Sequence, residues 1–318
     1  MKSVTQSHTP VFNFSRIALV AVATFLMGAQ GFGAYPSEEE TPAQRTEDYN
    51  SAVALMQDLA AKNPTVAQTF QLGVNNGGQA IMGLKVGTGA IHNLLVATHH
   101  GNEYGSTEIA KAFAKDLVLK PIQGQTIYII PVLNIPGYNM RARRETVNSR
   151  SYDPNRDYPG PCGSEGPFHL NSTKALADFV EREGIVASST IHTFSPAVLY
   201  PWGVSTHDLS TPYDAIFIEL ANLATQESHY TVGNSTEVLY AADGTFEDYA
   251  FWKHGIWSLL FEAGYSHSPN ATAVAELIRV NVPGLRRMYE HAPSARADDH
   301  AFHGKCDTRM RSMDRHDE

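Results

Sequence analysis

Residues 93–119, NLLVATHHGNEYGSTEIAKAFAKDLVL, give the clearest indication of the fold class. This stretch starts with the apolar run NLLVAT (93–98), which is typical of a strand buried on both faces of a parallel sheet. It ends with apolar residues at helical spacing over about 106–119. His100 and Glu103 stand between the two, where the strand gives way to a loop, and zinc accepts both side-chain types as ligands. The pair alone is also compatible with a purely structural role, so its meaning depends on the rest of the chain.

The alternation of strands and helices continues on both sides of this stretch. Apolar spacing predicts helices at about 46–61, 106–119, 173–183, 212–226 and 271–291, the last bent at Pro283. Apolar runs predict strands at about 66–72, 80–86, 93–98, 125–133, 186–192, 197–200 and 256–263. We therefore predict an α/β fold with a single domain, in which helices cover both faces of a mixed, mostly parallel, twisted sheet.

Residues 134–170 interrupt this pattern with many Pro, Gly, Asn and Arg residues. An irregular segment of this length inside a compact domain is unusual and is often functional. We therefore expect part of the active chemistry in this segment.

Composition excludes several classes of protein. The chain has 318 residues, 42% hydrophobic and 18% charged, which excludes a wholly disordered or coiled-coil protein. The net charge of −9 argues against nucleic acid or an anionic membrane as a partner. Fourteen His against two Cys leave room for histidine-based metal chemistry but not for a thiolate zinc site.

The N-terminal segment has the pattern of an export signal. Lys2 and Arg16 precede an apolar run over 17–27, and small residues follow it. A run of this length is shorter than the roughly 20 residues that a membrane-spanning helix needs, although a membrane anchor or a buried helix is the alternative. We predict a signal peptide over 1–33, export to the periplasm or the exterior, and no stable membrane anchor after cleavage.

The remaining boundaries follow from composition. We expect a short linker over 34–45, a catalytic domain over 46–292 and a polar tail over 293–318. Export would give Cys162 and Cys306 an oxidising compartment and permit a disulfide between them, the alternative being two free thiols. Such a bridge would tether a tail that is too polar to pack by itself.

Three further signals accompany His100 and Glu103. His192 ends the predicted strand 186–192, and Glu262 ends an apolar strand, where an unpaired buried charge would be costly. Asn155 and Arg156 follow a run of arginines and could together hold a carboxylate. Each also has a purely structural alternative: His192 could be a hydrogen-bonded core residue, Glu262 a paired acid, and the arginine-rich segment a solvated basic loop.

The ordered set HGNE, DPNRD, IHTFSPAVLYPWG, LYAADGTFEDY and FEAG resembles the zinc metallocarboxypeptidases of the carboxypeptidase A-like family. The resemblance runs from about Thr46 to Tyr289. It implies that His100, Glu103 and His192 hold one zinc ion per chain. It further implies that Glu262 is the general base, which takes a proton from the attacking, zinc-activated water and returns it to the leaving amine.

The resemblance also assigns the groups that meet the substrate's end. It implies that Asn155 and Arg156 grip the terminal carboxylate and that Tyr240 closes over it. An arginine of the upstream loop would stabilise the oxyanion, and the register favours Arg144, with Arg143 second. Arg141 and Arg150 are the other arginines of that loop.

Two positions invite a closer look at specificity. Asp157 stands where the family usually has Asn, so it either weakens carboxylate binding or orients Arg156. Glu247 stands where the family's side-chain specificity residue tends to lie. It would favour an amine-bearing terminal residue, either Lys/Arg or the diaminopimelate of peptidoglycan stem peptides. Alternatively, Glu247 or Asp248 caps a helix that starts near Phe246.

We therefore predict an exported zinc carboxypeptidase acting on peptides or cell-wall stem peptides. One alternative is a zinc amidase or deacylase of the same fold, acting on murein peptides or N-acyl amino acids. Another is a non-catalytic peptide-binding relative. A serine hydrolase is disfavoured because no Gly-x-Ser-x-Gly motif occurs. The sequence leaves the oligomeric state open.

Overall fold

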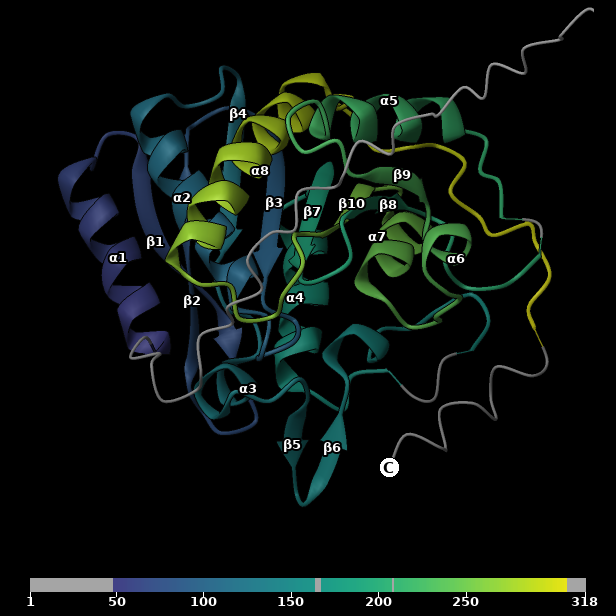
Figure 1. The fold of residues 1–318 in the computed structure, drawn as a ribbon, viewed down its shortest axis with the longest axis horizontal. Coiled ribbons are helices and arrows are strands. Elements are labelled where there is room, and N and C mark those ends of the chain that lie inside the picture. The colour runs from purple at the N-terminus through teal and green to yellow at the C-terminus, as the bar shows by residue number, and fades with distance from the viewer. Residues whose placement is uncertain (1–47, 164–166, 208, 308–318) are drawn as a thin grey trace, which may run out of the picture. The chain divides into compact units, whose positions relative to one another are not determined.

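An eight-stranded sheet organises the fold (Figure 1). The computed structural model describes residues 48–163, 167–207 and 209–307, so the predicted signal and linker lie outside the described residues. The strand order is β1-β2-β4-β3-β7-β10-β8-β9. The strands are β1 (Ala67–Val74), β2 (Ala80–Val86), β3 (Ile91–Ala97), β4 (Gln125–Ile130), β7 (Ala187–His192), β8 (Ala197–Tyr200), β9 (Thr231–Asn234) and β10 (Trp257–Glu262).

The sheet is mixed, with a parallel centre. Strands β4, β3, β7 and β10 run parallel, as do β8 and β9, whereas β1–β2, β2–β4 and β10–β8 are antiparallel. This architecture confirms the predicted α/β fold. Its parallel centre also brings the carboxyl ends of β3, β7 and β10 to one edge.

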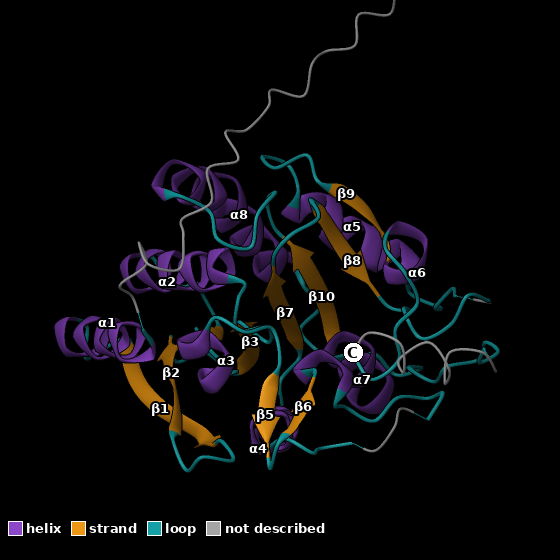
Figure 2. Ribbon diagram, turned by 60° about the horizontal axis from the view of Figure 1, so that its bottom comes forward, coloured by secondary structure: helices purple, strands orange, loops and turns teal. Residues whose placement is uncertain are grey.

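Helices cover both faces of the sheet. The longer helices are α1 (Tyr49–Lys62), α2 (Tyr104–Leu119), α4 (Asn171–Arg182), α5 (Asp214–Ala224), α7 (Phe246–His254) and α8 (Ala271–His291). Helices α2, α5 and α8 contribute mainly to one hydrophobic core, and α4 and most of the buried residues of α7 contribute to the other. Figure 2 shows the helices distributed around the strands in this way.

Strand β3 shows why the sheet separates two cores. Leu94, Leu95 and Val96 are all fully buried, with Leu95 in one core and its two neighbours in the other. Successive side chains of a strand point to opposite faces, so a strand buried on both sides must be apolar throughout. The apolar run that opens 93–119 therefore has a direct structural cause.

Residues 134–170 contain more regular structure than their sequence predicts. They form α3 (Ile135–Met140), a hairpin of β5 (Glu145–Val147) and β6 (Arg150–Tyr152), and the 3₁₀ turn η1 (Pro154–Arg156). Asn148 and Ser149 form the hairpin loop with φ of 50° and 65°. Two positive φ values in a two-residue loop match the twist of antiparallel strands.

A disulfide joins Cys162 to Cys306, with the two Cα atoms 5.4 Å apart. The described part of the tail is also tied to the domain by hydrogen bonds, because Arg296 donates to the carbonyl oxygens of Val180 and Ile185. Among the described residues, no helix combines the length and apolarity that crossing a membrane would require.

Candidate metal centre and active site

The predicted site residues lie at the edge where three parallel strands end. His100 and Glu103 follow β3, His192 ends β7 and Glu262 ends β10. Ala97 of β3 pairs with Ile191, and Glu262 pairs with His192, so the three strands end at the same level. The carboxyl ends of parallel strands are where open α/β sheets gather their sites.

Three buried side chains form a compact cluster at this edge. The Nδ1 atom of His100 lies 2.6 Å from Oε1 of Glu103, and Nδ1 of His192 lies 3.0 Å from Oε2 of the same carboxylate. The two Nδ1 atoms are 3.2 Å apart. Because His100, Glu103 and His192 each offer one ligand atom to a common point, they could hold a metal ion.

The charges of the cluster fit a cation. Burial opposes protonation of His100, but Glu103 and Asp153 outweigh it and raise the pKa of His100 to about 9. Burial alone would raise the pKa of Glu103, yet His100 and His192 lower it. The carboxylate therefore attracts positive charge at the point where both Nδ1 atoms converge. A divalent cation there would replace the proton held between His100 and Glu103, and the donor set of two imidazoles and one carboxylate suits zinc.

Asp153 is a member of the site to which we had assigned no role from the sequence. Its Oδ1 lies 3.0 Å from Nε2 of His100, on the side of the ring opposite Glu103. Burial would raise the pKa of Asp153, but His100 first and then the arginines lower it well below its usual range. A carboxylate in this position fixes the ring and its tautomer, as partners of metal-binding histidines do. The only sequence signal was its place at the start of DPNRD.

Arg143, rather than Arg144, reaches the cluster. Its Nη1 lies 3.1 Å from Nδ1 of His100 and 3.6 Å from Oε1 of Glu103. Its Nε and Nη2 donate to Oδ2 of Asp153 at 3.1 and 2.9 Å. Arg144 is exposed on the neighbouring position of the loop. Adjacent residues entering a strand point to opposite sides, so Arg143 faces the cluster while Arg144, which the sequence register favours for the oxyanion role, faces solvent.

Glu262 faces the cluster from β10. Burial raises the pKa of this carboxyl to about 7, although the nearby His192 and, more weakly, His100 and Arg143 lower it. Glu103 adds a like charge that raises it further. The pKa of Glu262 thus lies near neutral pH, which is the range that suits a general base.

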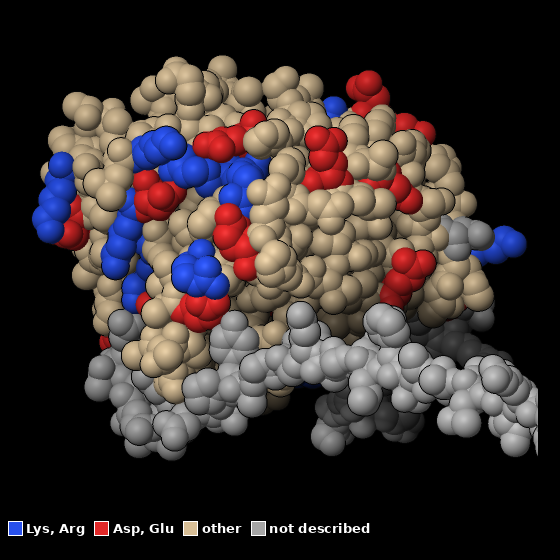
Figure 3. Space-filling view, turned by 45° about the horizontal axis from the view of Figure 1, so that its top comes forward, with Lys and Arg blue, Asp and Glu red and all other residues tan. Residues whose placement is uncertain are grey.

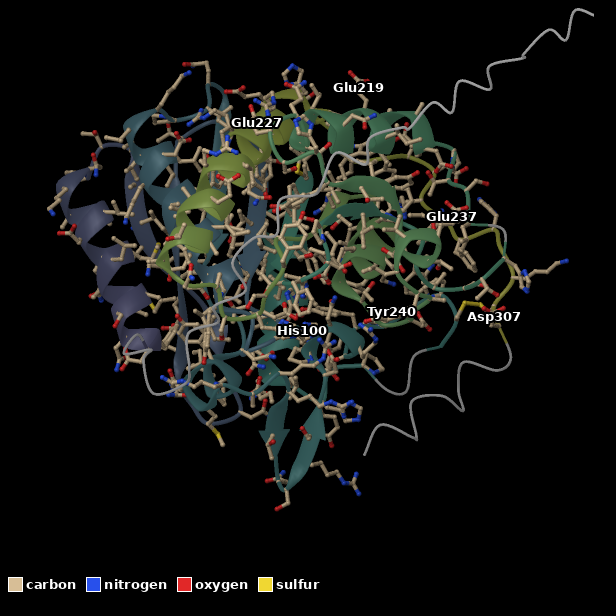
Figure 4. The ribbon with its side chains drawn as sticks, viewed as in Figure 1. His100, Glu219, Glu227, Glu237, Tyr240 and Asp307 are labelled. Carbon is tan, nitrogen blue, oxygen red and sulfur yellow. A yellow bond between two sulfur atoms is a disulfide. The ribbon has the colours of Figure 1, made fainter. Side chains whose placement is uncertain are left out.

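A second group of residues flanks the cluster. Asn155 is 3% exposed, and its Oδ1 accepts a hydrogen bond from the backbone of Phe246 at 2.9 Å. Arg156 donates from Nη2 to the hydroxyl of Tyr240 at 3.2 Å, and its guanidinium carbon lies 5.7 Å from the centre of that ring. Figure 4 shows Tyr240 to one side of His100.

Comparison with known proteins decides the family. The sequence profile of the family described as zinc carboxypeptidase matches residues 52–280. The chain belongs to the zinc carboxypeptidase family. The resemblance inferred from HGNE, DPNRD and FEAG is thereby confirmed.

The chain is also similar to individual proteins, one by sequence and two by fold. Human carboxypeptidase B is 28% identical over 264 residues, which cover 68% of this chain but only 63% of the human enzyme. Bovine thrombin-activatable fibrinolysis inhibitor, solved with tick carboxypeptidase inhibitor, superposes with a TM-score of 0.70 at 18% identity and covers 78% of this chain and 97% of that chain. A succinylglutamate desuccinylase from Silicibacter superposes with a TM-score of 0.52 at 18% identity, covering 74% and 70%. The fold of the zinc carboxypeptidases is therefore shared with a deacylase.

Asp157, where the zinc carboxypeptidases usually have Asn, is engaged elsewhere. Its Oδ2 accepts from the backbone of Leu170 at 3.0 Å and from Thr173 at 2.5 Å, and its Oδ1 accepts from the backbone of His169 at 2.8 Å. The carboxylate thus holds the segment that starts α4. Whether Asp157 also weakens carboxylate binding or orients Arg156 stays a prediction.

Glu247 is buried next to Asn155. It is 2% exposed, its Oε1 accepts from Thr190, and its Oε2 lies 3.5 Å from Nδ2 of Asn155. The alternative in which Glu247 or Asp248 caps the helix is wrong, because Thr245 is the N-cap of α7. Asp248 instead accepts from the backbone of Gly203.

Proposed function

We propose that the protein is a zinc metallocarboxypeptidase that hydrolyses the C-terminal peptide bond of peptides, with one zinc ion held by His100, Glu103 and His192. The observation that carries the proposal is the meeting of this cluster with Glu262 at one edge of the sheet. Membership of the zinc carboxypeptidase family supports the same reaction.

The proposed chemistry divides between the metal and Glu262. Zinc bound at the cluster would polarise the scissile carbonyl and make water a stronger nucleophile near neutral pH. Glu262 takes a proton from the attacking water onto its carboxylate and passes it to the nitrogen of the departing residue. This role is supported by its position beside His192 and by a pKa that burial raises to about 7.

We assign oxyanion stabilisation to Arg143 in place of Arg144. The negative charge that develops on the scissile carbonyl oxygen needs a fixed donor beside the cluster, and the Arg143 guanidinium is already held there by Asp153. A donor of this kind contributes roughly 3–4 kcal/mol to transition-state stabilisation in other hydrolases. Asp153 also orients His100, so it positions two groups at once.

Asn155 and Arg156 are proposed to bind the substrate's free carboxylate, with Tyr240 closing over it. The Arg156–Tyr240 hydrogen bond at 3.2 Å supports this, because an incoming carboxylate can replace the hydroxyl on the guanidinium. Tyr240 is 56% exposed, so it has room to move aside. Binding of a free carboxylate restricts cleavage to the last residue of a chain.

Glu247 is proposed to select an amine-bearing terminal residue. Its carboxylate lies 3.5 Å from Nδ2 of Asn155, so it adjoins the residue proposed to bind the substrate's free carboxylate. Lys, Arg and the diaminopimelate of peptidoglycan stem peptides all present a cationic group of suitable chemistry. The proposed substrates therefore include both peptides that end in Lys or Arg and peptidoglycan stem peptides that end in diaminopimelate.

We further propose that the protein is exported to the periplasm or the exterior. The Cys162–Cys306 disulfide supports an oxidising compartment, and the pattern of residues 1–33 supports a signal peptide. Nucleic acid is not proposed as a partner, because the net charge is −9 and, on the face shown in Figure 3, Asp and Glu stand among the Lys and Arg on the left and predominate on the right.

Product analysis by mass spectrometry tests the function. Peptides ending in Lys, Arg or Leu are incubated with and without a zinc chelator, each with a free and an amidated C-terminus. We expect loss of the last residue only from free C-termini and only without chelator. Cleavage of the amidated peptides would reject the Asn155–Arg156 role. Cleavage of N-acyl amino acids without cleavage of peptides would favour the deacylase, and no chelator-sensitive cleavage would favour a binding protein.

A further inference from the structure

Besides Tyr240, two exposed aromatic side chains follow site residues closely in the sequence. Phe194 follows His192 by two residues and is 46% exposed, and Tyr265 follows Glu262 by three residues and is 52% exposed. Phe194 is held edge-on against His267 at 4.9 Å between ring centres. Large apolar groups half exposed beside a site are candidates for ligand contact.

A cavity of about 250 Å³ begins at Tyr265. Its apolar lining comes from the loops before β9 and after β10 and from the first half of α8: Tyr230, Tyr265, Pro269, Ala273, Leu277 and Val280. An engineered apolar cavity of about 150 Å³ in another protein holds a benzene ring, so this one has room for one large side chain.

The wall of the cavity includes the loop that follows Glu262 at the end of β10. The backbone nitrogen of Gly264, two residues after Glu262, donates to the hydroxyl of Tyr230 at 3.1 Å. Gly264 has a φ of +73°, and a Cβ there would lie 2.6 Å from Leu277. The loop is therefore packed down onto α8, and the cavity wall cannot shift without moving the segment that carries Glu262.

Strand register gives the spacing between the cluster and the cavity. His192 pairs with Glu262, Glu262 with Ala197, and Ala197 with Thr231, which follows Tyr230 directly. These residues form a row across the sheet that spans three strand spacings, roughly 14 Å at about 4.8 Å each. An extended peptide rises about 3.3 Å per residue, so about four residues cover that distance.

The charges at the rim of the cavity are internally paired. Glu227 forms an ion pair with Arg287, and Arg279 donates to both oxygens of Glu276 at 2.6 Å. The rim thus offers little attraction to a charged group, while the interior is apolar. In Figure 4, Glu227 and Tyr240 lie in different directions from His100, so the cavity is on another side of the cluster from the carboxylate-binding pair.

We propose that this cavity is a remote subsite that binds a large apolar side chain of the substrate, about four residues before the scissile bond. The proposal rests on the proposed carboxypeptidase function and deepens it. With the terminal carboxylate on Asn155 and Arg156, the upstream chain leaves past Phe194 and Tyr265 and reaches Tyr230 and Leu277. The structure thereby favours longer peptides with an aromatic or branched aliphatic residue at that place.

Kinetics on a series of blocked peptides test the subsite. All members share the same last two residues, and alanines precede them to give lengths of two to seven residues. One Phe is then moved through the upstream positions. We expect kcat/KM to rise about tenfold when Phe stands three to five residues before the scissile bond, since burying a Phe side chain is favourable by an amount of this order. No dependence on the position of Phe would overturn the proposal.

Two variants on different faces of α8 separate the subsite from general damage, because residues two apart in a helix point in different directions. Ala273→Trp fills the cavity and should abolish the gain from Phe while sparing the blocked dipeptide. Ala275→Trp, at an exposed position that does not line the cavity, should keep the gain. If Ala273→Trp lowers dipeptide and long-peptide rates equally, or retains the gain, the subsite is rejected. If the wild type does not cleave the dipeptide or any longer member, the proposed function itself fails.

Discussion

Glu262 and His192 are register partners at the carboxyl ends of β10 and β7. This pairing brings a carboxylate that is not part of the ligand cluster next to one of the cluster's histidines. Since neighbouring strands lie about 4.8 Å apart, the arrangement is fixed by the sheet rather than by a loop. Sites built on strands keep their geometry better than sites on loops, so Glu262 and His192 should respond sharply to substitution.

Replacing Glu262 by Gln should abolish turnover without removing the metal. Gln keeps the size and part of the hydrogen-bonding capacity but cannot accept a proton, and general-base catalysis typically contributes 10²–10⁴-fold. We expect kcat to fall by about that factor while zinc content, measured by atomic absorption, stays at one per chain. Glu290→Gln, a partly exposed site on α8, is the matched control. Normal activity of Glu262→Gln would reject the base role.

The two adjacent arginines of the loop should behave differently. Arg143 contacts His100 and Asp153, and Arg144 is exposed. We expect Arg143→Gln to lower kcat about 10²- to 10³-fold, in line with the loss of one oxyanion donor. Arg144→Gln should leave kcat within about twofold. Equal effects of the two substitutions, or a larger effect at Arg144, would return the role to Arg144.

Asp153 should control metal affinity. Its contact with Nε2 of His100 at 3.0 Å fixes the ring that offers Nδ1 to the metal. Loss of such a partner typically weakens metal binding 10- to 100-fold. We expect Asp153→Asn to lose zinc at a chelator concentration 10- to 100-fold lower than the wild type requires. Competition with a chromogenic chelator measures this difference. Unchanged affinity would show that Asp153 acts on Arg143 alone.

The positions of the main strands and helices were predictable because buried elements require apolar residues at a regular spacing. The strand at 197–200 and the helix at 271–291 have the predicted limits, and the predicted strand at 80–86 is observed. In each case, burial on one or both faces demands a periodicity that the sequence must show. The hairpin at 145–152, strand β9 and helix α6 (Ser235–Val238) are short and polar, and they form because neighbouring elements hold them.

The clustering of three side chains was predictable from the sequence, but the contacts that support them were not. His100, Glu103 and His192 were identified from motif order, which reflects the sheet topology. The choice between Arg143 and Arg144 depends on which side of the chain faces the cluster as it enters β5, and one residue of register reverses that answer. Asp153 was not recognised from the sequence because its role depends on a contact with His100, which lies 53 residues away in the sequence.

Replacing Glu247 by Gln should change specificity more than rate. The Glu247 carboxylate is the proposed attraction for a cationic terminal side chain. Gln removes its charge, and it can still accept from Asn155 through its oxygen and donate to the Thr190 hydroxyl through its nitrogen. We expect the ratio of kcat/KM for Lys-ended to Leu-ended peptides to fall about tenfold or more, the order expected for loss of a charge-assisted contact. The same ratio in wild type and variant would reject the specificity role.

His254 should make the folded protein sensitive to acid. Burial, together with the nearby Arg296, lowers the pKa of His254 to about 4, and its Nε2 lies 3.1 Å from the hydroxyl of Tyr249. In the unfolded chain a histidine titrates near 6.5. Between these two values the unfolded state binds a proton that the folded state resists, so falling pH from about 6.5 to 4 favours unfolding.

Replacing His254 by Gln should remove this part of the acid sensitivity, because Gln can still hydrogen-bond to Tyr249 but does not titrate. A fully buried group would contribute about 1.4 kcal/mol per pKa unit, and the partial exposure of His254 makes the effect smaller. Urea unfolding of both proteins at several pH values between 7 and 4 measures it. We expect the free energy of unfolding of the wild type to fall faster with acid than that of His254→Gln. Parallel curves would show that His254 takes up its proton equally in both states, which its burial against Arg296 argues against.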